Sequence, residues 1–520
     1  MKSQNLVIAS VGCVVFLAGC TIGPEALTRD ERAEIIAKDR AMLLEPQVPI
    51  EEPISIYEAM ARTLANNIGY RVQLMEEAIA LGQFDLAKNE MLPQLTGTVE
   101  AVDRDAQSVS SSRSFLTQQQ SLEPSTSQDR SRVFGDLTFA WNLLDFGVSY
   151  YQAKQEANRA MIARELRRKS MQTLLLQVRS AYWQAAGAQR FEDEIRSLIE
   201  DANGALESAR EIERQRLQEP IAILRFQRSL IEVVRQMEGL LAVLQTAKNE
   251  LASLMGVAPG VEYTLLLPGE EDLSMPSFFV DLEQLEIVAF DQRPEIREEI
   301  YRGRITGDEK RKILLRALPG LEIRASRNYD SNSFLRHNWW REIGLNVSAN
   351  IIEILTVNQK LEQADNQSAA DDMRRLSVGA AILSQVRISL AQYQSSQEEL
   401  KRRGELSQLE ARILELVASN ASNDNESQLE RIRTQATSIS SRLERQKAFA
   451  DAQASFGRLL VSLGVDRLPA DVNTNDKREL KALLRERMSV WETGAITLDR
   501  LVIKSGEDPI ETTSVSTDAQ

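Results

Sequence analysis

The residue types that usually perform catalysis are scarce in this sequence. His337 is the single histidine, and the cysteines are Cys13 and Cys20. A lone histidine cannot supply a catalytic triad or a metal cluster, which need several such groups together, so we interpret His337 as a surface residue. The carboxylates are interspersed with arginines and lysines at helical spacing, which is typical of a solvated helix face. The sequence therefore predicts neither an enzyme nor a metal or cofactor site.

Cys20 is the one residue whose surroundings predict a covalent modification. Lys2 gives a short positive region, and residues 6–18 form an apolar run too short to span a bilayer as a helix. Leu-Ala-Gly at 17–19 then leads into Cys20, as at a secretory cleavage site. This stretch resembles a bacterial lipobox. We therefore expect residues 1–19 to be a lipoprotein signal peptide and Cys20 to carry diacylglycerol and an N-acyl chain.

The neighbours of Cys20 bear on its compartment and its linker. The other interpretation is an ordinary signal peptide with an incidental cysteine. Thr21 follows the cysteine, and in the resembling lipoproteins a residue other than aspartate there favours the outer membrane. Because Cys13 lies inside the signal, no thiol is left for a disulfide or a metal site. Residues 20–54 are charged and punctuated by prolines, so we expect a tether with one short helix over 29–43.

Composition and charge favour long helices and exclude one class of partner. The chain has 520 residues, of which 27% are charged and 5% aromatic. That is the composition of helices with solvated faces rather than of an all-β protein. The formal net charge is −14 with both signs interleaved, whereas nucleic-acid-binding domains present a basic face. We predict a mainly α protein with a small β part that does not bind nucleic acid.

The chain contains one long pattern twice. Residues 142–256 and 350–464 form intervals of equal length; each opens with an apolar pair and an acid, and each closes on Gly-Val. Upstream, Leu-Pro-x-Leu occurs at 92–95 and again at 318–321. A repeat of this size indicates a duplicated supersecondary unit. We divide the chain into a first repeat, a linker, a second repeat and a C-terminal extension, at residues 55–257, 258–280, 281–465 and 466–520.

The first repeat predicts a helix, a β-hairpin and a helical hairpin. Ser55 and Glu58 form a capping box, and the helix that they open should run to about Asn89. Alternating residues on both sides of a long Ser- and Gln-rich loop predict a β-hairpin over 95–146. A helical hairpin then covers 149–256. Apolar residues on its returning arm step by three and four, which favours coiled-coil packing, although a plain core helix gives a similar stripe. These residues are Leu230, Val233, Met237, Leu240, Leu244, Ala247, Leu251 and Leu254.

The second repeat predicts the same order of elements. A helix begins near residue 281, a β-hairpin covers 320–350, and a helical hairpin covers 353–464. The polar run 420–427 marks the turn of that hairpin. Beyond the repeat, residues 477–491 have the spacing of one amphipathic helix.

The helix lengths suggest how each repeat is assembled. The long arm has about seventy residues, roughly 100 Å at 1.5 Å per residue. The opening helix and the returning helix are each about half as long, so end to end they match the long arm. Each repeat can therefore form two antiparallel rods of similar length with a two-stranded hairpin at one end.

The four strands raise a problem of closure. Strands of about eight to ten residues can cross a bilayer when they are tilted. Four strands cannot close a barrel, and an open edge is not viable in lipid. Several chains must therefore share one barrel: two would give eight strands and a filled interior, and three would give twelve with a lumen. Aromatic residues near the strand ends fit two interfacial girdles, or simply pack within the strands. They are Trp141, Phe146, Tyr329, Phe334, Trp339 and Trp340.

Taken together, these features resemble the outer membrane efflux protein family, the TolC-like channels, in its lipoprotein branch. The resemblance is carried by the doubled pattern, the Leu-Pro-x-Leu before each hairpin, the Trp-Asn-Leu-Leu-Asp-Phe-Gly at 141–147 and the Leu-x-Gly-Val repeat ends. It implies a homotrimer with a twelve-stranded transmembrane β-barrel, four strands per chain, and an α-barrel of long coiled-coil hairpins that forms a periplasmic tunnel.

The same resemblance implies partners and a function. The family serves as a passive conduit in tripartite efflux or type I secretion systems. Its helical tips dock to a periplasmic adaptor (membrane fusion) protein and, through it, to an inner-membrane transporter. We accordingly expect a channel in the outer membrane, anchored there by the lipid on Cys20 and extending into the periplasm.

The helical tips hold the candidate gate residues. In the family these tips constrict the periplasmic end of the tunnel, where rings of acids can select cations. The second tip carries Asp424, Glu426 and Glu430. The family often has Asp-Val-Leu just after a tip, but this chain has Pro-Ile-Ala-Ile-Leu at 220–224 and Gln-Leu-Glu at 428–430. The alternative interpretation is a set of acids in a solvated turn.

Two other classes of protein share part of this pattern. A lipid-anchored periplasmic adaptor also has helical hairpins, but it needs a single hairpin and an inserted β-domain. A coiled-coil scaffold without a pore would need no strands of membrane length. Conductance in planar bilayers separates both from a channel.

Overall fold

The structure is a computed structural model, and contacts divide it into two units. It describes residues 26–43, 50, 52–121, 123–215, 219–258, 261–267, 269, 273–419, 425–465, 468, 476–489 and 495–501. The first unit comprises Met1–Glu51 with Val257–Tyr263, and the second comprises Glu52–Gly256 with Thr264–Gln520. The predicted signal peptide, Cys20 and the turn residues 420–424 lie outside the described residues.

The first unit contains one described helix. Helix α2, Arg29–Leu43, has the predicted bounds, and all of its residues are exposed. Thr28 caps it: the backbone N–H of Glu31 donates to Thr28 Oγ1 over 3.2 Å. The backbone N–H and hydroxyl of Thr28 in turn donate to the carboxylate of Glu31 and lower its pKa. The short helix predicted for the tether is confirmed.

The opening helix of each repeat is two helices rather than one. In the first repeat, α3 (Ile56–Asn66) is followed by α4 (Ile68–Asn89), and Asn67 between them is extended. The predicted cap of α3 is present, since the N–H of Glu58 donates to Ser55 Oγ over 3.2 Å. The single helix predicted to run to Asn89 was wrong because Asn67 caps a new helix by accepting from the N–H of Tyr70.

The second repeat breaks at the matching position. Helix α7, Leu282–Gln292, ends where Arg293 takes an extended conformation, and α8, Pro294–Arg316, follows. Proline disfavours a helical conformation in the residue before it and fits the first turn of a helix. Pro294 therefore explains both the end of α7 and the start of α8.

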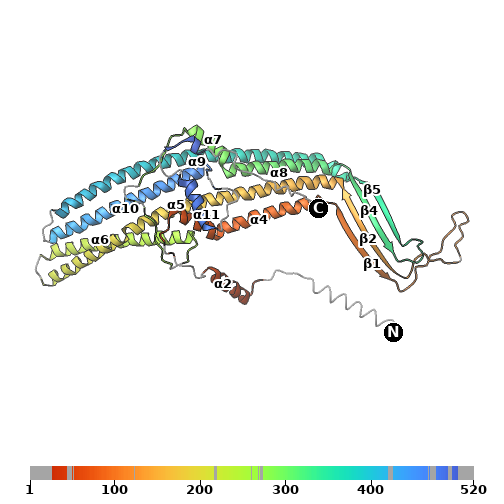
Figure 1. The fold of residues 1–520 in the computed structure, drawn as a ribbon, viewed down its shortest axis with the longest axis horizontal. Helices are drawn as coiled ribbons and strands as arrows, with labels where there is room; N and C mark the ends of the chain where they lie inside the picture. Colours follow the sequence, from red (N-terminus) through yellow and green to blue (C-terminus); the bar gives the residue numbers. More distant parts are fainter. Residues whose placement is uncertain are drawn as a thin grey trace, which may run out of the picture. The chain divides into compact units, whose positions relative to one another are not determined.

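Four long strands form one antiparallel sheet at one end of the helices (Figure 1). They are β1 (Gln94–Asp103), β2 (Ser131–Asn142), β4 (Gly320–Asp330) and β5 (Trp339–Ser348), in that order. Each repeat supplies one hairpin, and β2 of the first pairs with β4 of the second. The sheet therefore joins the two repeats.

The long helices begin immediately after the strands. Helix α5 covers Leu143–Arg214 and α9 covers Ile351–Ser419. Asn142 caps α5 by accepting from the N–H groups of Leu144 and Asp145. The strand predicted to continue to residue 146 was therefore wrong, because the side chain of Asn142 starts the helix first.

The returning helices complete the rods. Helices α6 (Pro220–Leu254) and α10 (Asn425–Ser462) pack along α5 and α9. As predicted, α6 and α4 lie end to end beside α5 (Figure 1). The apolar stripe predicted on α6 is a core: Leu230, Met237 and Leu244 are buried against residues of α5 and α10.

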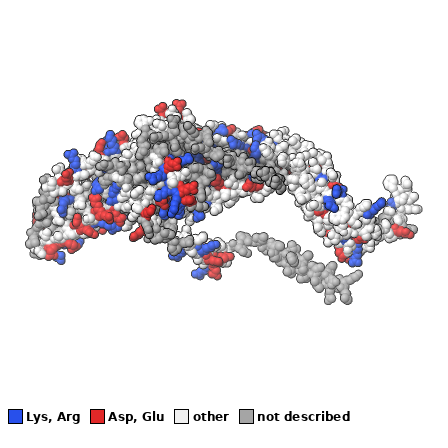
Figure 2. Space-filling model, in the orientation of Figure 1, with Lys and Arg blue, Asp and Glu red and all other residues white. Residues whose placement is uncertain are grey.

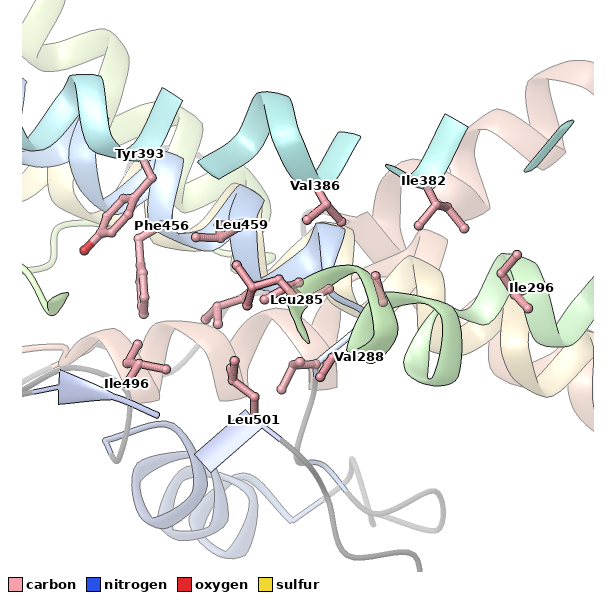
Figure 3. Close-up of a cluster of buried hydrophobic side chains, with 14 residues drawn as sticks. Leu285, Val288, Ile296, Ile382, Val386, Tyr393, Phe456, Leu459, Ile496 and Leu501 are labelled. Carbon is pink, nitrogen blue, oxygen red and sulfur yellow. The ribbon is translucent and has the colours of Figure 1, made fainter. Parts of the chain in front are cut away.

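The C-terminal extension packs against the middle of the helices. Helix α11, Lys477–Ser489, buries Leu480, Leu484 and Met488 and packs on α3. Strand β6 (Ala495–Ile496) pairs in parallel with β3 (Ser277–Phe278), which belongs to the predicted linker. Helix α12 covers Leu498–Leu501. In Figure 3, Ile496 of β6 and Leu501 of α12 join a cluster formed by α7, α9 and α10. The extension thus contacts both repeats.

Candidate functional site

The sheet has one apolar face that is exposed over most of its length, although Trp141 at its helix end packs against Phe146 of α5. Directly opposed residues of antiparallel strands share a face, and the register aligns Leu95, Phe139, Ala325 and Ile343 across the four strands. Ile343 is 83% exposed, Val99 81% and Leu345 68%. Figure 2 shows largely uncharged atoms over the sheet, whereas the helices carry both charges. We call this surface the apolar face.

The opposite face of the sheet is polar. Its residues alternate with those of the apolar face, and the register aligns Thr96, Thr138, Ser326 and Glu342 across the four strands. An exposed apolar face backed by a polar one is the reverse of a soluble sheet, which turns its apolar residues toward a core. It matches the alternation of membrane strands around an aqueous interior.

Both edges of the sheet are open. Strand β1 pairs only with β2, and β5 pairs only with β4, among the described strands of this chain. A long apolar strand with one free edge offers unpaired backbone groups to another strand. The sheet is therefore incomplete as a single copy.

The two outer helices also carry apolar stripes that lack a partner within the described chain. On α4, residues at spacings of three, four and seven are exposed; on the tip half of α9, residues at spacings of three and four are exposed. Such spacing is typical of helix–helix contacts. The stripes consist of Ile68, Val72, Met75, Ile79 and Leu86 on α4, and Leu406, Leu409, Ile413 and Leu416 on α9.

Each returning helix ends on a glycine that touches the break in its own repeat. Gly256 has a φ of 66° and Gly464 a φ of 68°, a region that favours glycine. A Cβ on Gly256 would lie 2.8 Å from the Cβ of Asn66, and one on Gly464 would lie 2.7 Å from the backbone of Arg293. We call these contacts the first and second junctions.

Charged side chains reinforce the second junction. Arg168 of α5 donates to the carbonyl oxygens of Gly464 and Gln292 over 2.8 and 2.9 Å. Arg293 donates to the carbonyl of Val461 over 3.1 Å and pairs with Glu295 at 2.9 Å. Burial acts to raise the pKa of Glu295, but the charges of Arg293 and Lys169 and the hydrogen bonds outweigh it, so this pKa lies below its usual value.

The predicted gate residues are only partly described. Asp424 lies outside the described residues, and Glu426 lies in the first turn of α10, where its side chain is not described. Glu430 is an exposed residue of α10. At the first tip, Pro220 begins α6, and Ile221 and Leu224 are exposed. The predicted ring of acids therefore stays a prediction.

The described residues contain no group of three or more His, Cys, Asp or Glu side chains placed to hold a metal ion. His337 is exposed between β4 and β5, as expected for a surface residue. Among the residues that the structure describes, no helix is both long and apolar enough to cross a membrane.

Comparison with known proteins establishes the fold. No family model matches the sequence, and neither does any curated protein. Several solved structures are similar over most of their length. The CmeC outer membrane channel of Campylobacter jejuni has 11% identity and a TM-score of 0.61, over 89% of this chain and 97% of CmeC. The outer membrane protein VceC of Vibrio cholerae has 13% identity and a TM-score of 0.58, over 79% of this chain and 96% of VceC.

A third similar structure is the outer membrane channel OprN, with 16% identity and a TM-score of 0.56, over 86% of this chain and 99% of OprN. Identities this low support a statement about the fold. The chain has the fold of the TolC-like outer membrane channels, and the resemblance seen in the sequence is confirmed at that level.

The sequence predicted the strands, but it did not show which surfaces of the strands and helices lack a partner within the chain. The alternation in β5 and the girdle aromatics were visible in the sequence, and in the structure the rings of Tyr329 and Trp339 contact each other with centroids 4.6 Å apart. The stripe on α4 was also visible as a spacing, but only the structure shows that it faces no other helix. The junction glycines appeared only as repeat ends, because their contact with the helix breaks is tertiary.

Proposed function

We propose that this chain is the outer membrane channel of a tripartite efflux or type I secretion system, acting as a passive conduit. Three copies would join their sheets into a twelve-stranded barrel in the outer membrane. Their helices would form an α-barrel through the periplasm. The observation that carries this proposal is the open-edged sheet with an exposed apolar face, set on helices of about 100 Å.

The geometry supports association between copies. A barrel needs every strand edge paired, and β5 of one copy offers its free edge to β1 of the next. Because α4 and the sheet-side half of α9 lie at opposite sides of the row α4–α5–α8–α9, the stripe on α4 could meet the sheet-side half of α9 of a neighbouring copy, where Leu355, Met373 and Leu376 are exposed. Such a head-to-tail contact closes into a ring when the rotation per copy allows it.

The adaptor and transporter are proposed partners at the helical tips, and the acids at Asp424, Glu426 and Glu430 are proposed to select cations there. The diacylglycerol and N-acyl chains proposed on Cys20 would add a second hold on the outer membrane. No catalytic step is proposed for the chain.

Conductance in planar bilayers tests the proposal. We expect the purified full-length protein to give stable single-channel currents. We also expect a cysteine pair, one on β1 and one on β5, to cross-link chains into a closed trimer. An adaptor or a scaffold would give neither result, and a cross-linked ladder of open chains would contradict the barrel.

A further inference from the structure

Two arginines interrupt the apolar face of the sheet near the end farther from the helices. Arg327 of β4 and Arg341 of β5 are directly opposite each other in the register. Both side chains are exposed, and neither forms an ion pair within the described residues. Like charges opposed across a strand pair destabilise a sheet. Their position therefore calls for an anion that the described chain does not supply.

The surroundings of the two arginines are otherwise neutral. The acids nearest in sequence, such as Glu322 and Glu342, belong to the polar face. On the apolar face of the four strands, the only other charged residue is Asp103, at the far end of β1, where it accepts from Ser131 Oγ. No described acid of this chain therefore faces the arginine pair.

The level of the pair along the strands points to a boundary. One residue pair farther out, the rings of Tyr329 and Trp339 contact each other, tilted by 43°, and the guanidinium of Arg327 lies 5.2 Å from the Trp339 ring. One pair farther in, Ala325 and Ile343 begin the uninterrupted apolar band. Neighbouring pairs on one face are about 7 Å apart along a strand. The arginines therefore lie between an aromatic belt and an apolar band, where headgroup phosphates meet acyl chains.

We propose that Arg327 and Arg341 form a binding site for the phosphate group of an anionic membrane lipid in the leaflet farther from the helices. This proposal rests on the proposed membrane location of the sheet. A guanidinium presents a planar fork of donors that matches a phosphate, and one phosphate between two forks relieves their repulsion. The acyl chains of the same lipid would cover Ile343 and Leu345.

Reconstitution in lipid nanodiscs tests the site. The full-length protein is placed in phosphatidylcholine with and without phosphatidic acid, and retained phosphatidic acid is measured by native mass spectrometry. We expect the double variant Arg327→Gln/Arg341→Gln to bind phosphatidic acid roughly tenfold more weakly, as expected from the loss of charge-assisted hydrogen bonds. The matched control is Arg324→Gln, on the same strand but the polar face, where Arg324 pairs with Glu322 at 2.9 Å. It should bind like the wild type.

Three results would overturn the site. Equal retention by the double variant and the control would show that the arginines do not bind the lipid. If inorganic phosphate alone binds the detergent-solubilised protein as tightly as phosphatidic acid does, the two arginines form a site for a free anion. If the double variant no longer weakens phosphatidic acid binding once Asp103→Asn is also present, the arginine pair contacts β1 of a neighbouring copy. Each of these results can coexist with normal conductance, whereas a protein that neither inserts nor conducts would contradict the proposed function as well.

Discussion

In the first repeat the returning helix ends at Gly256 against Asn66, and in the second it ends at Gly464 against Arg293. The backbone solution is the same, since both glycines have a positive φ and both touch a break in the opening helices. The side chains differ: one amide of Asn66 donates to the Met255 carbonyl at the first junction, and several charged groups act at the second. The backbone geometry is common to the repeats, and the polar chemistry around it is not.

The largest effect should come from making the two hairpins unequal. Deleting seven residues from each arm of the first hairpin, near its tip, preserves the heptad phase and shortens the rod by about 10 Å. We expect efflux to fall to the level of cells lacking the protein, because the two tips no longer reach the same plane. Cellular efflux is the measurement. Trimer formation should survive, and the same deletion in both hairpins should restore part of the activity; wild-type efflux from the single deletion would contradict the comparison.

Alanine at the two junction glycines should distinguish the repeats. Gly464→Ala places a Cβ against the backbone of Arg293 and forces a non-glycine residue into a left-handed conformation, which should cost about 4 kcal/mol in unfolding free energy. At Gly256 one atom lies that close, the Cβ of Asn66 at 2.8 Å, and the next lies at 3.5 Å, so Gly256→Ala should cost somewhat less, about 3 kcal/mol. Denaturant unfolding in detergent measures both. The control Gly204→Ala meets nothing within 4 Å on α5 and should stabilise slightly.

The two tips should differ in their effect on ions. Neutralising Asp424, Glu426 and Glu430 together should reduce the preference for cations roughly threefold, because a ring of acids selects by its field. Reversal potentials in a salt gradient measure the preference. Glu219→Gln, beside Pro220 at the first tip, is the matched control and should change little. An unchanged reversal potential in the triple variant would show that these acids do not select ions and are solvated residues of the turn.

The smallest effect should be a dependence of stability on acidity at the second junction alone. The folded pKa of Glu295 lies below its usual value of 4.5. Its ionised form therefore stabilises the protein above that value, and this stabilisation is lost as the pH falls through the folded pKa. Glu295→Gln should lower stability at neutral pH, by less than either glycine substitution, and flatten the acid dependence measured by denaturant unfolding. The first repeat has Gly69 at the matching position, so Gly69→Gln should leave the acid dependence as it is.

Local signals in the sequence were sufficient for most of the architecture. The cap at Ser55, the stripe from Leu230 to Leu251 and the alternation in β5 each reflect a short-range rule, and the structure bears these out. The break in the second repeat was also encoded locally, since Pro294 disfavours a helical Arg293. The interval from Asn67 to Pro93 equals that from Arg293 to Pro319, and this match could have extended the break to the first repeat.

The remaining features depend on contacts between distant segments. No local pattern states that Ile496 and Leu501 join a cluster with Leu285, or that Leu480 packs on α3. The opposition of Arg327 and Arg341 follows only once the register of β4 and β5 is known. The gate acids were suggested by residue type alone, and their role remains a prediction.

The pairing of β2 with β4 has a consequence for assembly. It joins the hairpin of one repeat to the hairpin of the other inside a single polypeptide. The seams of the proposed barrel are the contacts between neighbouring hairpins. Every second seam is therefore made during folding of one chain, at the high effective concentration of linked segments. Half-length subunits would have to form all of these seams by diffusional encounter and lose translational freedom each time. Duplication therefore lets half of the contacts between hairpins form within a chain rather than between chains.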